Sequence, residues 1–260
     1  MSGCEVAIAG YGLWLPHHAS AAAWAARTPA AEECKPVGLA FDKVNRRRAS
    51  PFGRAIGDAA EEAMAMAGVD AASTAIVVGS SIGEAATMIG LLDTMWRTRE
   101  PMSPAAFTVS VHNAASGILS ISKKNTGYVT SLAADHDTPA AALLEGVGLV
   151  AAGHPAVLVV CADEASPRHL LADAAHWDQL AAAVVLVPAG AGPGRVRLVM
   201  PEAGPATVAP PEFGGLCGRN PQVGLADLVD AVMRGASGVL RLDRGDGRGL
   251  RAGLLPGRPA

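Results

Sequence analysis

Residues 126–164 read TGYVTSLAADHDTPAAALLEGVGLVAAGHPAVLVVCADE, and this stretch decides the fold class. Residues 126–133 contain enough β-branched and aromatic side chains to predict a strand. Residues 138–152 begin with a Thr-Pro pair and have the composition of a helix. Residues 156–162 form an unbroken apolar run, as expected of a strand that is covered on both faces. This alternation predicts a layered α/β domain with a mainly parallel sheet.

The chain before this stretch repeats the same alternation. Residues 5–10 (EVAIAG) and 75–79 (AIVVG) are predicted to be buried strands. Between them, Ser50 is a helix N-cap and Pro51 the first helical residue, and Gly68 ends the helix as a C-terminal cap. After the opening stretch, residues 179–187 and 195–200 are predicted to form a hairpin-like pair around the turn AGAGPG.

The composition changes after Met200. Residues 201–215 are rich in proline and glycine and are expected to form a mobile linker. Residues 216–260 are expected to form a small C-terminal extension with one short helix and two strand-like runs. We therefore expect one main domain over residues 1–200, followed by the linker and the extension.

Bulk composition excludes several function classes. Half of the 260 residues are hydrophobic and only 17% are charged, so apolar surface left over after folding favours an oligomer or a heteropartner. A net charge of −3 and an aromatic content of 4% argue against nucleic-acid binding.

The cysteines and the N-terminus predict a reduced, soluble protein. The four cysteines contain no CxxC pair, so we expect neither a metal site nor any cofactor. The N-terminus has no signal-peptide pattern, and no run of eighteen apolar residues predicts a membrane span. These features favour the cytoplasm.

The opening stretch, together with HNAASG at residues 112–117, resembles the core of β-ketoacyl synthases. In that family a strand leads into a nucleophile elbow, and a helix and an acid-terminated strand follow. The segments EVAIAGYGLWLP, AIVVGSSIGE and LAAAVVLVPAG resemble further family strands in the same order, so the resemblance covers roughly residues 4–200. It is closest to the short synthase-like proteins named for chain length factors of aryl-polyene and related polyketide pathways. The fold implied is half of a thiolase-like architecture, with helices flanking a five-stranded mixed sheet.

The departure from the family lies at the nucleophile. Counting back from GHPAVLVVCADE places the synthase cysteine on His136, and a shift of one residue would give Asp135 or Asp137. Cys161 lies inside an apolar strand and should be inert. The two catalytic histidines of the family belong to a second half of the fold that this chain lacks, so decarboxylative condensation by this chain is not expected.

The resemblance implies a site-like elbow built from six residues. They are the catalytic candidates His136, Ser131 and His112 and the pocket candidates Asn113, Asp135 and Asp137. The histidine between two aspartates suits general acid–base work, but a solvated turn explains the same pattern.

Three functions remain open at this point. The first is a non-condensing accessory protein that pairs with a full-length ketosynthase or with itself, through the strand TGYVTSLAA, and contacts an acyl carrier protein. Because such carriers are acidic, Arg46, Arg47 and Arg48 or the Lys123–Lys124 pair would dock them, although a solvated turn is the simpler explanation. The second is an acyltransferase or thioesterase that uses His136 as a base. The third is a structural remnant within a larger complex, and in each case some segment must cover the face that a second half would bury.

Overall fold

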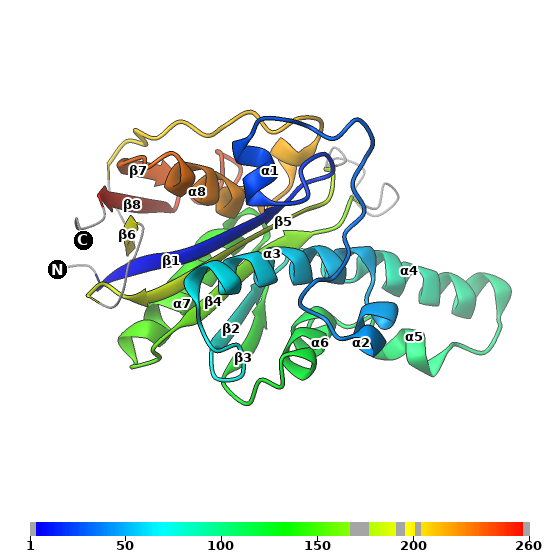
Figure 1. The fold of residues 1–260 in the computed structure, drawn as a ribbon. Helices are drawn as coiled ribbons and strands as arrows, with labels where there is room; N and C mark the ends of the chain where they lie inside the picture. The colour runs from blue at the N-terminus through cyan, green and yellow to red at the C-terminus, as the bar shows by residue number, and fades with distance from the viewer. Residues whose placement is uncertain (1–3, 167–176, 191–195, 201–203, 257–260) are drawn as a thin grey trace.

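The computed structural model describes residues 4–166, 177–190, 196–200 and 204–256 and contains one sheet of eight strands in the order β3-β2-β4-β5-β1-β6-β8-β7. Figure 1 shows this sheet crossing the molecule between helices. The strands are β1 Cys4–Trp14, β2 Ala75–Gly79, β3 Val129–Leu132, β4 Val157–Asp163, β5 Leu180–Pro188, β6 Val196–Met200, β7 Gly238–Arg241 and β8 Arg251–Pro256.

The expected five-stranded mixed sheet is confirmed as β3-β2-β4-β5-β1. Strand β2 is parallel to β3 and β4, whereas β5 is antiparallel to β4 and β1. β2 and β4 are fully buried, as their apolar sequences predict. Three further strands extend the sheet beyond β1.

The predicted hairpin-like pairing of residues 179–187 with 195–200 is wrong. β1 lies between β5 and β6 and pairs antiparallel with both of them. With eleven residues, β1 is long enough to pair with β5 over residues 6–14 and with β6 over residues 4–8. Residues 191–195 of the expected turn lie outside the described residues.

Helices cover both faces of the sheet (Figure 1). One face packs against α3 and α6, and the other packs against α7 and α8, each with its own cluster of buried apolar side chains. The helices are α1 Ala21–Ala25, α2 Lys43–Arg48, α3 Pro51–Ala67, α4 Ala85–Asp93, α5 Pro104–Thr108, α6 Ala114–Ser122, α7 Thr138–Ala151 and α8 Val223–Met233, with a π-helical turn η1 at Thr94–Thr98 and 3₁₀ turns η2 at Asp135–Asp137 and η3 at Cys217–Arg219.

The bounds of α3 follow from its caps. The Ser50 hydroxyl accepts the Gly53 amide, and Gly68 ends the helix in the left-handed region at φ 65°. The predicted helix start and end are therefore confirmed. Its packing depends on Gly12 of β1, because a Cβ there would lie 2.1 Å from the Ala59 carbonyl oxygen. Gly10 permits the same close approach one turn further along the helix, where a Cβ would lie 2.2 Å from the Ala63 carbonyl oxygen.

The described part of the segment after Met200 is held to the rest of the chain at a few positions, although most of residues 204–215 are exposed. Val208 and Phe213 are buried, and the Thr207 and Val208 amides both donate to the Val239 carbonyl oxygen. The ten residues from 223 to 232 of α8 are all buried. This helix, together with α7, covers one face of β1 and β5, so the tail provides the cover that the apolar face requires.

Gly224 sets how closely α8 approaches the segment after β7. A Cβ at this position would lie 1.7 Å from the Leu242 carbonyl oxygen, and backbone cannot move aside as a side-chain end can. We expect Gly224→Ala to lower the free energy of unfolding by about 3 kcal/mol or more, measured by urea denaturation.

The matched control is Gly148→Ala in α7, where an added methyl group meets nothing within 4 Å. Because alanine favours the helix over glycine, the control should be neutral or stabilising by up to about 1 kcal/mol. Equal stability of the two variants would contradict close packing between α8 and Leu242.

Candidate functional site

The turn between β3 and α7 has the geometry of a strained elbow, which we define as residues 134–137. Asp135 adopts a left-handed backbone conformation at φ 51°, which non-glycine residues rarely adopt. Three hydrogen bonds hold the turn. The Ser81 hydroxyl donates to the Asp135 carbonyl oxygen (3.0 Å), the Ala134 amide donates to the Thr138 hydroxyl (2.8 Å), and the Asp137 amide donates to the Ala134 carbonyl oxygen (3.0 Å). The surrounding structure therefore over-determines a conformation that is unfavourable in itself.

The structure divides the six predicted site residues between two cavities. Asp135, His136 and Asp137 line the elbow cavity, which has a volume of about 630 Å³. The other three line a second cavity of about 580 Å³ between α6 and the edge strand β3. They are His112, Asn113 and Ser131.

Hydrogen bonds occupy the polar groups of the second cavity. The Ser131 and Ser116 hydroxyls lie 2.8 Å apart and bond to each other. The Nε2 atom of His112 lies 2.8 Å from the Ser80 carbonyl oxygen, and because a carbonyl only accepts, Nε2 carries the proton. These contacts favour a structural role for the predicted catalytic candidates Ser131 and His112.

The second wall of the elbow cavity comes from the C-terminal tail, which the sequence analysis did not connect with the elbow. Asp246, Gly247 and Arg248 line this wall. The Arg248 amide donates to Asp137 Oδ1 at 2.9 Å, and its guanidinium Nε lies 3.5 Å from Asp137 Oδ2. The partners are 111 positions apart in sequence, so the only local signal was the turn-forming run GDGRG.

Charge around the elbow cavity is mostly negative. Asp135, Asp137 and Asp246 are opposed by Arg248, and His136 is the remaining titratable group of the described lining. An imidazole in this setting can accept or donate a proton. Carboxylates in this number repel an anionic substrate group, such as a carboxylate or a phosphate, by Coulomb's law.

No cysteine belongs to the described lining of the elbow cavity. Cys161 is fully buried in β4, where loss of solvation raises the pKa of its thiol far above the ordinary value. Burial likewise raises the pKa of Cys217 to about 12. Neither thiol forms an appreciable thiolate near neutral pH, so neither is a nucleophile.

Behind the elbow, the tail is bonded to the end of β4. The fully buried Asp163 carboxyl accepts from the Ser80 hydroxyl, from the Ser81 amide at 3.0 Å and from Gln222 Nε2 at 2.7 Å. Burial raises the pKa of Asp163. Gln222 Nε2 also donates to the Ser81 hydroxyl at 2.8 Å, so this tail residue supports the elbow through Ser81.

A second acid follows at the end of β4. Burial, with a smaller contribution from the nearby Glu84 and Asp163 carboxyls, raises the pKa of Glu164 to about 7. The Ala86 amide at the start of α4 donates to Glu164 at 2.6 Å. This carboxyl therefore holds the beginning of α4 and is partly protonated near neutral pH.

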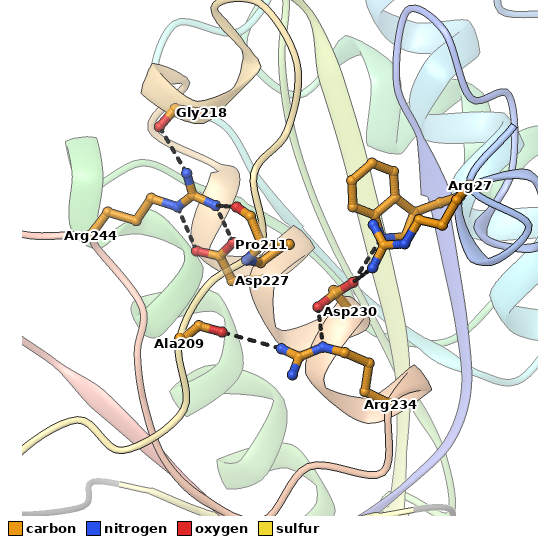
Figure 2. Close-up of polar contacts among 9 residues, drawn as sticks. Arg27, Ala209, Pro211, Gly218, Asp227, Asp230, Arg234 and Arg244 are labelled. Carbon is orange, nitrogen blue, oxygen red and sulfur yellow. Dashed lines mark hydrogen bonds and ion pairs between the residues drawn. The ribbon is translucent and has the colours of Figure 1, made fainter. Parts of the chain in front are cut away.

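Two buried aspartates attach α8 to the rest of the chain (Figure 2). Asp227 accepts from Arg244 Nε at 2.8 Å and Nη2 at 2.6 Å, and Arg244 also donates to the Pro211 carbonyl oxygen. Asp230 accepts from Trp24 Nε1 at 2.8 Å and from Arg27, as well as from Arg234 in the next turn of the helix.

The two aspartates join several segments to α8. They link the helix with the N-terminal region, the segment near residue 211 and the loop after β7. Burial raises the pKa of Asp227 to about 6, although hydrogen bonds from Arg244 oppose the shift.

Arg244 is the partner that makes the burial of Asp227 tolerable. We expect Arg244→Met to cost about 3–5 kcal/mol of unfolding free energy, because it leaves a carboxylate buried without a cation. The double variant Asp227→Asn/Arg244→Met should recover part of this loss. Chemical denaturation of each variant measures the difference.

The matched control comes from the same loop. Arg248 also pairs with an aspartate, but its side chain is 88% exposed. Arg248→Met should therefore cost less than about 1 kcal/mol. Similar losses for the two single variants would show that burial does not determine the strength of these pairs.

The predicted basic patch is only partly available for docking. Arg46 donates to the Gly38 and Phe41 carbonyl oxygens and so serves the fold, whereas Arg47 and Arg48 are exposed at the end of α2. In the alternative patch, Lys123 pairs with Glu61 and Lys124 is exposed. No helix among the described residues is long and apolar enough to cross a membrane.

The fold, with its strand-to-helix elbow and two helix layers, defines a thiolase-like α/β protein. The chain matches the family described as Beta-ketoacyl synthase, N-terminal domain over residues 21–211. This match spans more than half of the chain, which therefore belongs to that family.

Solved structures show the same fold at low sequence identity. The chain aligns with one chain of the complex between the ketosynthase ApeO and its chain length factor ApeC from Xenorhabdus doucetiae, at 23% identity and a TM-score of 0.69, covering 96% of this chain and 98% of that one. It aligns with the ishigamide ketosynthase/chain length factor at 16% identity and a TM-score of 0.62, covering 75% of this chain and 66% of that one. It aligns with a β-ketoacyl synthase from Burkholderia phymatum at 15% identity and a TM-score of 0.56, covering 75% of this chain and 62% of that one. No curated protein sequence matches the chain significantly.

Proposed function

We propose that this protein is a non-condensing, chain-length-factor-like accessory subunit of a fatty-acid-type or polyketide pathway such as aryl-polyene biosynthesis. The observation that carries the proposal is the elbow: its strained backbone is present, but its side chains are Asp135, His136 and Asp137. Two of the aligned structures are named as ketosynthases with chain length factors, which supports the same role.

The chemistry of the elbow supports a role without condensation. A condensing enzyme holds its acyl group as a thioester, which requires a thiolate, and an imidazole is no substitute for a persistent thioester. The aspartates of the elbow cavity would also repel the carboxylate of a malonyl-type extender. We infer that chain extension takes place on a partner subunit.

A full-length ketosynthase is the partner that we propose, with a second copy of this chain as the alternative. β3 is at the end of the sheet, and its four residues are only partly buried. α6 contacts β3, and the segment from α4 to α6 carries exposed apolar side chains, with α4 extending away from the sheet (Figure 1). These side chains are Leu92, Met95, Trp96, Phe107, Val111 and Ile121. An unpaired strand edge beside exposed apolar groups is typical of a protein interface.

Ile121 tests this interface, because it lies on α6 beside β3 and is 69% exposed. We expect Ile121→Glu to weaken association with the ketosynthase of the same host at least tenfold, since a carboxylate would be buried against apolar surface. Co-expression followed by size-exclusion chromatography and titration calorimetry measures the effect.

The control for this experiment is Val37→Glu, an exposed apolar position in the loop before α2. This variant should bind the ketosynthase as the unmodified protein does. Full affinity of Ile121→Glu would show that this face is not the interface, and failure of the unmodified chain to bind the ketosynthase would contradict the accessory role with that partner.

Acyl carrier docking is a separate element of the proposal, and it rests on Arg47 and Arg48. Reversing both charges (Arg47→Glu/Arg48→Glu) should weaken the binding of an acidic, phosphopantetheine-loaded carrier protein and reduce its salt dependence. Ketosynthase association should not change. A matched reversal at Arg97, which is exposed on η1, serves as the control. If the unmodified protein, the Arg47→Glu/Arg48→Glu variant and the Arg97 variant bind the carrier with equal affinity, α2 is not part of the docking surface.

A further inference from the structure

The tip of the β7–β8 hairpin, residues 243–249, contacts the elbow. β7 and β8 pair antiparallel, and the Leu242 amide donates to the Leu250 carbonyl oxygen at the base of the tip. The close approach of Leu242 to Gly224 places this base beside the start of α8. From there the tip contacts Asp137, so it forms a wall of the elbow cavity.

The tip is internally rigid at its base. The buried Asp243 carboxyl accepts from Arg241 Nε, from the Gly245 amide at 3.0 Å and from the Gly249 amide. Arg244, Gly245 and Gly249 all have left-handed backbone conformations, at φ 50°, 115° and 81°. These bonds close residues 243–249 into a compact loop. They leave the loop little freedom to deform within itself.

The tip is also anchored to α8 at its root, which is Arg244. Arg244 makes two hydrogen bonds to Asp227, whose side chain is fully buried in α8 (Figure 2). Breaking such a buried pair by removing one partner costs about 3–5 kcal/mol. The root is therefore strongly attached to the helix.

The contact between the tip and the elbow is weak by comparison. It consists of the Arg248 amide on Asp137 Oδ1, the Arg248 guanidinium 3.5 Å from Asp137 Oδ2, and the packing of Gly247 on the same carboxylate. The Arg248 side chain is 88% exposed, and exposed ion pairs contribute about 0–1 kcal/mol. A strong root and a weak outer contact are the properties of an element that can swing as one body.

We propose that residues 243–249 form a lid on the elbow cavity, latched by Asp137 and pivoting at its base beside Leu242 and Leu250, while the long Arg244 side chain keeps its guanidinium on Asp227. In the latched state the lid narrows access to His136 from the side of the tail. When the latch is released, the elbow cavity opens while α8 stays in place. The lid regulates the site on which the proposed function rests, so a bound partner that contacts Asp137 or Arg248 would change the state of the elbow.

Hydrogen–deuterium exchange on the full chain tests the lid. Asp137→Ala removes both latch contacts, whereas Arg248→Ala removes the ion pair and leaves Asp137 Oδ1 as the acceptor for the amide of residue 248. In both variants we expect this amide to exchange at least fivefold faster than in the unmodified protein. The amides of α8 should keep their exchange rates. In the unmodified protein, 0.5 M sodium chloride should speed amide exchange in the tip, because salt screens an exposed ion pair. In Asp137→Ala, which lacks this ion pair, salt should not change the exchange rate.

Access to His136 is the second measurement. Diethyl pyrocarbonate modifies exposed imidazoles, and the exposed His17 serves as an internal reference within each protein. Relative to His17, modification of His136 should rise at least threefold in Arg248→Ala. The control is Arg219→Ala, an arginine of the same tail that is outside the described lining of the elbow cavity, and it should leave the ratio unchanged.

Two outcomes would overturn the lid. Unchanged exchange of the tip in Asp137→Ala would show that Asp137 is no latch. Faster amide exchange in both the tip and α8 would show that the whole tail opens, and not the lid alone. Neither outcome depends on the ketosynthase, so the lid and the accessory role can fail separately.

Discussion

The burial of two carboxylates on α8 is the constraint on which the rest of this structure depends. α8 covers the face that α7 shares with β1 and β5, and it does so with all of its first ten residues out of solvent. Asp227 and Asp230 are part of that buried surface, and a buried carboxylate is tolerated only with partners. The arginines that pair with them belong to the N-terminal region, to the helix itself and to the loop after β7. The need to pair two charges therefore determines where several distant segments lie.

The same arrangement explains how the tail completes the elbow. Once Arg244 is held on Asp227, the residues that follow it are placed beside Asp137, and Gln222 at the start of α8 reaches Asp163 and Ser81. The elbow is thus supported from both sides by a segment outside the matched family region of residues 21–211. Its strained backbone is held by hydrogen bonds to Ser81 and Thr138, and the tail strengthens this support because Gln222 donates to the Ser81 hydroxyl.

A family fold with an elbow does not by itself imply the family's reaction. The backbone of the turn and the surrounding layers belong to the scaffold, whereas the reaction depends on the side chains placed there. Here those side chains are two aspartates around a histidine, with a third aspartate from the tail. The described thiols are elsewhere, and the two whose pKa is raised are buried. This combination of side chains is the basis of the proposal that the protein acts through a partner rather than by chemistry in the elbow.

The sequence by itself determined the elements whose signals are local. The caps of α3 at Ser50 and Gly68, the apolar strands β2 and β4, and the helix α7 between β3 and β4 all depend on neighbours within a few residues, and the structure contains them. What only the tertiary structure decided are contacts between distant residues. β6 pairs with β1 rather than with β5, Val208 and Phe213 are buried, and Arg248 meets Asp137 across 111 positions. Composition describes the residues of a segment but not the surface that it will meet, and the free energy of burying that surface is what fixes a tail in place.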